Sequence, residues 1–316
     1  MKEVLFAPKK KWHLPAMLLM DVLASFFNVL AADRVVVQFG GYHALMPVLW
    51  AKILGKPSAV VLGGYDAVAL PEIHYGAFAN TFMRKAVVMA YKNASMLIPV
   101  HQSLVESSST YTGIKVRQGV KHFIPNIKTP FAIVPNGYDA SLWKLNTHSK
   151  REFLAVTVAS GLHEERRKML KGIDLFLAAA EKLPQEKFLI IGGKITQAPP
   201  NVVCLENVPN NELSEHFNRC KSYLQLSLSE GFPNALCEAM LCGCLPVVSN
   251  VASMPEIIQD SGFILHEKDA NKLVDILNKV PSVHSVEAMM LARSTIESRF
   301  SYKQRAKQLL YTIATM

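Results

Sequence analysis

The chain has 316 residues, of which 50% are apolar and 19% are charged. This composition excludes an intrinsically disordered chain, and the length predicts roughly two domains, each large enough to bury its own core. The net charge is +9, and residues 1–140 hold 14 basic against 7 acidic side chains. Such a half suits an anionic membrane surface or an acidic acceptor; no zinc finger, aromatic RNA-binding motif or long Arg-rich tail is recognisable, which argues against nucleic acid.

The chain begins with a basic and then an apolar segment. Residues 14–32 are nearly all apolar and follow Lys9, Lys10 and Lys11, but Asp21, Ser25 and Asn28 interrupt the run on one helical face. An Asp near a bilayer centre costs about 2.5 to 3.5 kcal/mol, so we expect no spanning helix. A buried helix is favoured over a helix lying in a membrane surface. Both leave the protein cytoplasmic, the second as a peripheral protein on the inner face of the membrane.

Short apolar runs then alternate with helical patterns through the first half. This alternation predicts parallel strands joined by crossover helices. We expect strands at 4–7, 34–39, 58–62 and 96–100, and helices at 14–30, 43–54 and 77–91. Because ligands bind at the carboxyl ends of parallel strands, Gly63, Gly64, Tyr65 and Asp66 are predicted to face a cleft. For Asp66, a helix-capping role is an equal alternative.

The stretch 131–143, FAIVPNGYDASLW, has a strand ending in Pro135, an Asn-Gly turn and a capping Asp139. We place the domain boundary here, which gives domains 1–142 and 143–316. The second half then repeats the pattern. We expect strands at 153–158, 188–191, 222–226, 245–248 and 262–265, and helices at 172–183, 211–219, 235–242, 269–279, 283–297 and 302–314.

Residues 229–256 read as loop, short helix, buried strand and turn. Gly231 permits a tight turn, Pro233 fixes the approach to the helix, and Asn234 is predicted to be its N-cap. A helix N-terminus beside a glycine-containing loop suits a phosphate, because its backbone N–H groups are free. Glu230 precedes this phosphate cradle and Glu238 lies about one turn inside the helix, so the two carboxylates are expected to flank one ligand.

The segments EGFPNALCEAM, GCLPVV and PEII closely resemble the donor-site signature of retaining, nucleotide-sugar-dependent glycosyltransferases, the group 1 (family 4-like) transferases of the GT-B fold. The resemblance implies two Rossmann-like parallel-sheet domains facing a cleft, with the last helix crossing back to the first domain. It also implies that Glu230 binds donor-sugar hydroxyls near the reacting carbon and that Glu238 binds the ribose hydroxyls. The other donor-binding residues that we expect are Gly231, Phe232, Pro233, Asn234, Ala235, Leu236, Asn207 and Val208. The backbone of residues 234–236 is expected at the diphosphate, and the base near residues 207–212.

The segment HEERRKMLKG, 163–172, carries the cations expected at the diphosphate. Lys171 and Gly172 match the family's Lys-Gly element, but the family's Gly-Arg-Leu is altered to Ser-Gly-Leu. Arg166 or Arg167 is therefore expected to substitute, and we select Arg167 as catalytic together with Lys171 and Glu230. The chain contains no Asp-x-Asp pair, so we expect metal-independent catalysis with no cofactor besides a UDP- or GDP-linked sugar donor.

The resemblance implies transfer of a sugar to a polysaccharide or lipid-linked acceptor with retention of anomeric configuration, the acceptor lying near residues 63–66. The family's usual first-domain histidine is replaced by Gly63, and His74 and His101 are candidates for its place. This departure keeps a second hypothesis open, a non-transferring nucleotide-sugar protein such as an epimerase or an inactive binding subunit. A basic nucleic-acid-binding protein is the third and weakest alternative.

Overall fold

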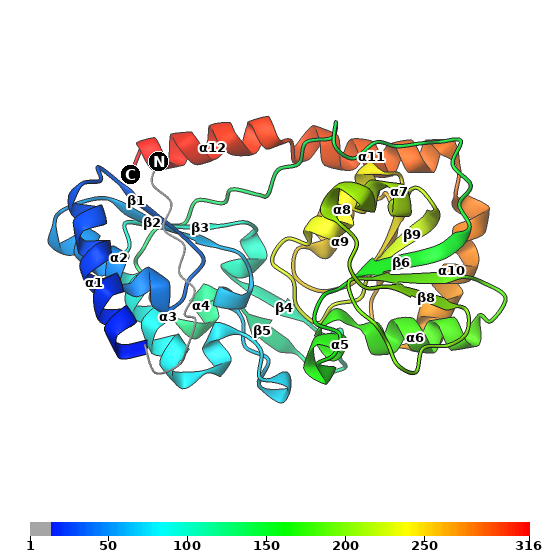
Figure 1. Ribbon diagram of the computed structural model, residues 1–316, viewed down its shortest axis with the longest axis horizontal. Coiled ribbons are helices and arrows are strands. Elements are labelled where there is room, and N and C mark those ends of the chain that lie inside the picture. Colours follow the sequence, from blue (N-terminus) through cyan, green and yellow to red (C-terminus); the bar gives the residue numbers. More distant parts are fainter. Residues whose placement is uncertain (1–13) are drawn as a thin grey trace.

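The computed structural model describes residues 14–316 and contains one parallel sheet in each half of the chain (Figure 1). The strand predicted at 4–7 and the lysines at 9–11 lie outside the described residues. The first half contains α1 (Leu14–Leu30), β1 (Val35–Gln38), α2 (Tyr42–Ile53), β2 (Ser58–Leu62), α3 (Thr81–Asn93), β3 (Met96–Pro99), β4 (Ser107–Ser109), β5 (Val116–Gln118) and α4 (Val120–Phe123). Short 3-10 turns at Tyr65–Ala67, Pro71–Ile73, Ala77–Ala79 and Gln102–Leu104 separate them.

The first sheet has the strand order β1-β2-β3, and all its pairs are parallel. Every residue of the central strand β2 is buried, because it has a neighbour on each edge and Val-rich side chains on each face. Helix α2 packs between α1 and α3 and covers β1 and β2. The helix predicted at 77–91 begins only at Thr81, because the Asn80 side chain accepts a hydrogen bond from Met83 N and caps it there.

A short antiparallel hairpin formed by β4 and β5 stands apart from the first sheet. In Figure 1 it lies in the middle of the molecule, between the two parallel sheets. The sequence contains no strong strand pattern here, since β4 consists of three serines, and the hairpin was not predicted.

The second half contains β6 (Phe153–Val158), α5 (Glu165–Lys171), α6 (Ile173–Lys182), β7 (Phe188–Ile191), β8 (Val202–Leu205), α7 (Leu213–Phe217), β9 (Cys220–Gln225), α8 (Asn234–Leu241), β10 (Leu245–Ser249), α9 (Met254–Ile258), β11 (Phe263–Leu265), α10 (Ala270–Val283), α11 (Val286–Arg299) and α12 (Tyr302–Ala314). Its six parallel strands have the order β11-β10-β9-β6-β7-β8. Strands β7 and β8 extend the sheet on one side of β6, whereas β9, β10 and β11 extend it on the other side. The strand order therefore changes direction between β6 and β9, and crevices for ligands form at such topological switch points.

The final helix returns to the first domain, as predicted, and Figure 1 shows α12 running along the top of the molecule. Ser301 and Gln304 form a capping box that starts this helix. Arg305 donates to the carbonyl oxygens of Val134 and Pro135 in the interdomain segment, and Arg34 donates to those of Ile313 and Met316. The predicted α/β architecture of two parallel-sheet domains with a crossing C-terminal helix is confirmed.

Candidate functional site

The loop between β9 and α8 holds Glu230 in a fixed position. Its Oε1 accepts hydrogen bonds from Lys171 Nζ at 2.6 Å, Ser227 Oγ at 2.8 Å and Gln225 Nε2 at 3.0 Å. The Glu230 side chain is only 12% exposed and that of Lys171 25%, so water screens the ion pair weakly. The structure thus brings together two of the three residues predicted to be catalytic.

Lys171 reaches Glu230 because α5 ends against the same loop. The segment 163–172 contains this helix, which the sequence analysis did not predict, because the helix expected in this region began at residue 172. Leu228 N donates to Leu170 O, and Gly172 follows in the left-handed conformation with φ of +67°. A Cβ at Gly172 would overlap the Leu226 carbonyl oxygen, so the close approach of the helix to the loop requires glycine.

Arg167, the third predicted catalytic residue, lies on the exposed side of α5 with its aliphatic stem over Gly161. Its neighbours Arg166 and Lys168 pair with Glu164 and Glu165, whereas no carboxylate of residues 14–316 pairs with Arg167 within 4.0 Å. Burial raises the pKa of Tyr75 to about 12, and among the nearby charges Glu230 raises that pKa while Arg167 lowers it. Arg167 therefore faces the same region as Glu230, and its guanidinium group has no ion-pair partner among the described residues.

The glycine turns of the two domains touch beside Glu230. A Cβ at Gly231 would overlap the Gly63 carbonyl oxygen, and one at Gly64 would lie 3.1 Å from Gly231 N. Tyr65 follows, 44% exposed, with its ring edge-on to that of Tyr75 at 5.2 Å. Gly63, Gly64 and Tyr65 therefore do lie opposite the Glu230 loop.

The structure corrects the prediction that Asp66 faces the cleft. It is 1% exposed, and its carboxylate accepts bonds from the N–H groups of Gly40, Gly63 and Gly64 and from the Tyr91 hydroxyl. Burial raises the pKa of Asp66, and these hydrogen bonds oppose the rise. Asp66 fastens the turns after β1 and β2, so it neither faces the cleft nor caps a long helix.

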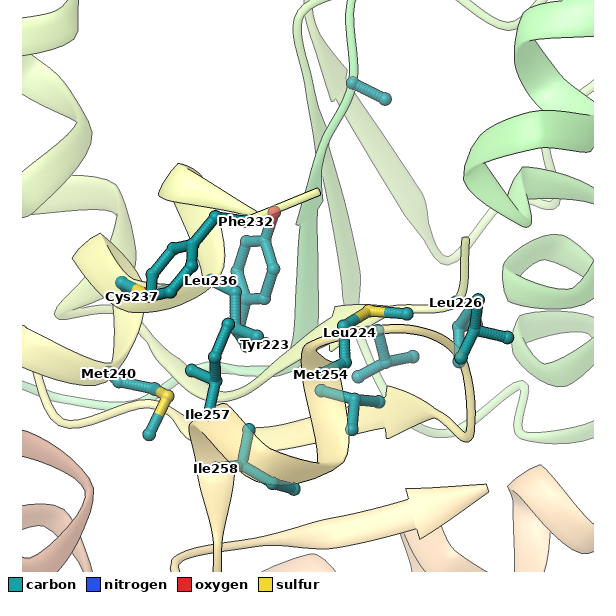
Figure 2. Close-up of a cluster of buried hydrophobic side chains, with 14 of the residues drawn as sticks. Tyr223, Leu224, Leu226, Phe232, Leu236, Cys237, Met240, Met254, Ile257 and Ile258 are labelled. Atoms are coloured by element: carbon teal, nitrogen blue, oxygen red, sulfur yellow. The ribbon is translucent and has the colours of Figure 1, made fainter. Parts of the chain in front are cut away.

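Phe232 and Pro233 are buried, and the Phe232 side chain packs into the core. Its ring packs on Phe300 at 5.0 Å and on Tyr138 at 6.4 Å. Figure 2 shows it within a buried cluster that also includes Tyr223, Leu236 and Cys237. Phe232 and Leu236 can therefore meet a donor only through their backbone atoms.

Asn234 is not the N-cap of α8, because Pro233 takes that place and Asn234 begins the helix. The Asn234 Oδ1 instead accepts bonds from Asn136 Nδ2 and the Tyr138 hydroxyl, both at 2.9 Å. The interdomain segment thus positions the start of α8, while no side chain caps the first-turn N–H groups. Ala235 follows, half-buried, in this first turn.

Asn207 and Val208 lie in the loop after β8. This loop and α9, which follows β10, lie on opposite sides of the switch point between β6 and β9. Asn207 is exposed and Val208 packs against the core, so the two present one polar and one apolar contact. No cluster of three or more His, Cys, Asp or Glu side chains able to hold a metal ion occurs within residues 14–316.

His101 also lies between the domains, although its sequence context gave no firm assignment. It is 8% exposed. Its Nδ1 accepts a hydrogen bond from the Ser103 N–H and lies within hydrogen-bond distance of the Ser103 hydroxyl. Its Nε2 is 3.1 Å from Glu256 Oε2, and its ring is 6.4 Å from that of Phe232. Burial lowers the pKa of His101, and Glu256 opposes this effect. His74, the other candidate, is exposed on the turn after Ile73.

Glu238 lies on α8, is half-buried, and has no hydrogen-bond or ion-pair partner among the described residues. Desolvation raises its pKa from 4.5 to about 7. A carboxylate in this condition gains from any ligand that supplies hydroxyl donors, because these replace the water that it has lost.

This raised pKa predicts a pH-dependent effect of Glu238→Gln on stability. Below pH 4.5 the carboxyl is protonated in both folded and unfolded chains, so wild type and variant should be equally stable. As pH rises through 7, the wild type must bear a poorly solvated charge that the variant lacks. We expect thermal and urea unfolding at pH 8 to show the variant more stable by about 1 to 2 kcal/mol, a value discounted for partial solvent exposure. Glu206→Gln, at an exposed site, is the control. Equal effects of the two substitutions would contradict the assignment.

Comparisons with known proteins show what the chain is similar to in sequence and in fold. Residues 156–281 match the family model described as Glycosyl transferases group 1. An uncharacterized 41.2 kDa protein in the cps region of Klebsiella pneumoniae is 34% identical over 117 residues, which cover 34% of this chain and 33% of that protein. The amylovoran biosynthesis glycosyltransferase AmsK of Erwinia amylovora is 34% identical over 112 residues, which cover 32% of this chain and 27% of AmsK. The chain thus matches about a third of the length of these curated relatives.

Among solved structures, Anabaena HepE in complex with UDP-glucose superimposes with a TM-score of 0.73 at 17% identity, over 97% of this chain and 84% of HepE. Because the sequence identity is low, this superposition shows that the two proteins share a fold and carries no statement about activity. The chain therefore has the GT-B fold, and its residues 156–281 are similar to the group 1 glycosyl transferases.

Proposed function

We propose that the protein transfers a sugar from a nucleoside diphosphate donor to a polysaccharide or lipid-linked acceptor, with residues 143–316 holding the donor and residues 1–142 the acceptor. The observation that carries the proposal is the Lys171–Glu230 pair, placed where the β9–α8 loop enters a helix with uncapped N–H groups. The GT-B fold, the family match and the UDP-glucose bound by HepE support it.

The chemistry follows from where charge develops during transfer. The anomeric carbon gains positive character, and the departing diphosphate gains negative charge that Lys171, Arg167 and the start of α8 can stabilise. Glu230 lies next to Lys171 and can hold donor-sugar hydroxyls at the reacting carbon. Glu238, further along α8, can accept bonds from the ribose, and the Asn207–Val208 loop can contact the base. With these cations present, the transfer requires no metal ion.

We further propose that the anomeric configuration is retained, by attack on the same face that the diphosphate leaves. In this course the leaving phosphate takes the acceptor's proton, so no protein nucleophile is needed. Glu230 already has one carboxylate oxygen engaged by three donors, which favours a binding role over nucleophilic attack. The configuration of the product linkage, read by NMR, tests this point, and an inverted product would exclude it.

A panel of nucleotides should identify the donor. Thermal unfolding with UDP, GDP and their sugars, in the presence of EDTA, should show stabilisation by one nucleotide series, of about 2.7 kcal/mol at 100 times its dissociation constant. Glu238→Ala should lose most of this gain, and the exposed Glu206→Ala should keep it. Stabilisation only when a divalent metal is added would contradict the metal-independent part. Donor hydrolysis without any acceptor-dependent product would favour a non-transferring protein.

We also propose that the first domain docks on an anionic membrane. Helix α1 exposes Leu23, Phe27 and Leu30 at helical spacing, and α3 exposes Phe82 and Met89. Lys85 and Lys92 lie on the same α3 stripe as these two apolar residues, and this half of the chain carries most of the excess positive charge. Within residues 14–316, no helix is both long and apolar enough to span a bilayer.

Vesicle sedimentation tests the docking. The protein should bind vesicles containing phosphatidylglycerol more than pure phosphatidylcholine, and added salt should weaken this binding. Phe27→Asp or Phe82→Asp should lower it at least several-fold. Leu291→Asp, at a comparably exposed apolar site on α11 of the other domain, should not. Equal losses in all three variants would place the contact elsewhere.

A further inference from the structure

A cavity of about 260 Å³ lies between the two domains, and Glu230 forms part of its wall. Most of the surface that lines it is apolar, and both halves of the chain contribute aliphatic side chains to it, among them Leu70, Leu104, Ile114, Val116, Met169 and Leu228. The cavity is therefore a site that exists only when the two domains are together.

The β4–β5 hairpin forms one side of the cavity and is fastened to the second domain. Ser109 Oγ donates to the Asn250 carbonyl oxygen at 2.8 Å, and Lys268 N donates to that of Tyr111 at 2.9 Å. Figure 1 shows β4 and β5 between the two sheets. These bonds make the hairpin a fixed wall rather than a free loop.

Several polar side chains in the lining are already occupied by the protein. Gln118 exchanges two hydrogen bonds with the backbone of Ala69, Ser103 contacts His101, and Ser109 contacts Asn250. A glycan bound here would need a donor or acceptor for each of its hydroxyls, and these three side chains already have partners in the protein. The lining therefore favours a hydrocarbon group over a sugar.

One buried polar atom of the lining lacks a partner. Tyr111 lines the cavity and is 2% exposed, yet its hydroxyl has no hydrogen-bond partner in the described part of the chain. An unpaired buried hydroxyl is unfavourable, and a single polar atom on a bound ligand would satisfy it.

We infer that this cavity binds the apolar aglycone of the acceptor, a short alkyl or prenyl segment bearing one polar linking atom, with the reacting end of the acceptor directed to Glu230. The assignment of that reacting end rests on the proposed transferase function. The small volume lies just below the usual range for ligand pockets, so it suits one short segment rather than a whole lipid tail.

Alkyl glycosides of increasing chain length test the inference. Binding of methyl, n-butyl and n-hexyl β-D-glucoside, measured by calorimetry below their micelle concentrations, should strengthen about four-fold per buried methylene, and so on the order of 60-fold from methyl to butyl. Ile114→Asp, a change at the exposed edge of the cavity, should remove most of this length dependence. Ile53→Asp, at a similarly exposed residue of α2 outside the cavity, should leave it intact.

The nucleotide panel separates the two proposals. If a nucleotide stabilises the protein but affinity does not change with alkyl length, the cavity assignment is wrong and the donor site stands. If affinity rises with alkyl length and is lost in Ile114→Asp while no nucleotide binds, the cavity takes an apolar group and the transferase proposal fails. A length dependence that survives Ile114→Asp would overturn the location proposed here.

Discussion

Glu230→Gln should lower turnover at least 100-fold while donor binding survives. The amide keeps the size of the carboxylate, and its oxygen can still accept the bonds from Lys171, Ser227 and Gln225, so the loop should keep its conformation. The negative charge beside the reacting carbon is lost, and removal of one preorganised electrostatic group typically costs 10² to 10³ in rate. Acceptor-dependent product formation and nucleotide-induced thermal stabilisation give the two readouts.

The partner of Glu230 allows a sharper control. Lys171→Met alone should destabilise the fold by about 2 kcal/mol, because it leaves a weakly solvated carboxylate without its cation. Lys171→Met combined with Glu230→Gln should recover most of that stability and none of the turnover. If the double variant regained activity, the pair would be structural. Turnover in Glu230→Gln at the wild-type rate would remove Glu230 from the reaction.

Gly231→Ala should disrupt the closed arrangement of the two domains. The new Cβ would overlap the Gly63 carbonyl oxygen, which belongs to the other domain, so either the β9–α8 loop or the whole domain must move. Overpacking of this kind costs about 1 to 3 kcal/mol, and a displacement near 1 Å at a site can cost on the order of 100-fold in rate. We therefore expect a comparable loss of turnover, with a larger radius of gyration in solution scattering if the domains separate.

Gly55→Ala is the matched control for this substitution. Gly55 has a positive φ of +66° and open space around the position that a Cβ would take, so alanine there brings backbone strain of about 1 to 2 kcal/mol without any collision. The control should lose stability and keep its turnover. A Gly231→Ala variant that behaved in the same way would show that the contact between the two glycine turns is not needed for function.

The strands at 58–62, 153–158 and 188–191 could be predicted to the residue because they are buried on both faces. A continuous run of Val, Ile, Leu and Ala between turn residues leaves little freedom in where such a strand begins and ends. Helix 302–314 was equally clear, since Ser301 caps it locally. By contrast, α5 buries only Leu170 within the helix, and its many charges hid it from a periodicity argument.

The sequence by itself identified the Glu230 loop and the helix that follows it, because Gly231, Pro233 and Glu238 act through local backbone geometry and a helix start within a few residues. Only the tertiary structure decided what each polar side chain does there. Asn234 accepts bonds from Asn136 and Tyr138, almost 100 residues earlier in the chain, and so does not cap its own helix. Asp66 is withdrawn from the cleft by Gly40 and Tyr91. A side chain's hydrogen-bond partner depends on which distant segments the fold brings within about 3 Å, and local sequence does not contain that distance.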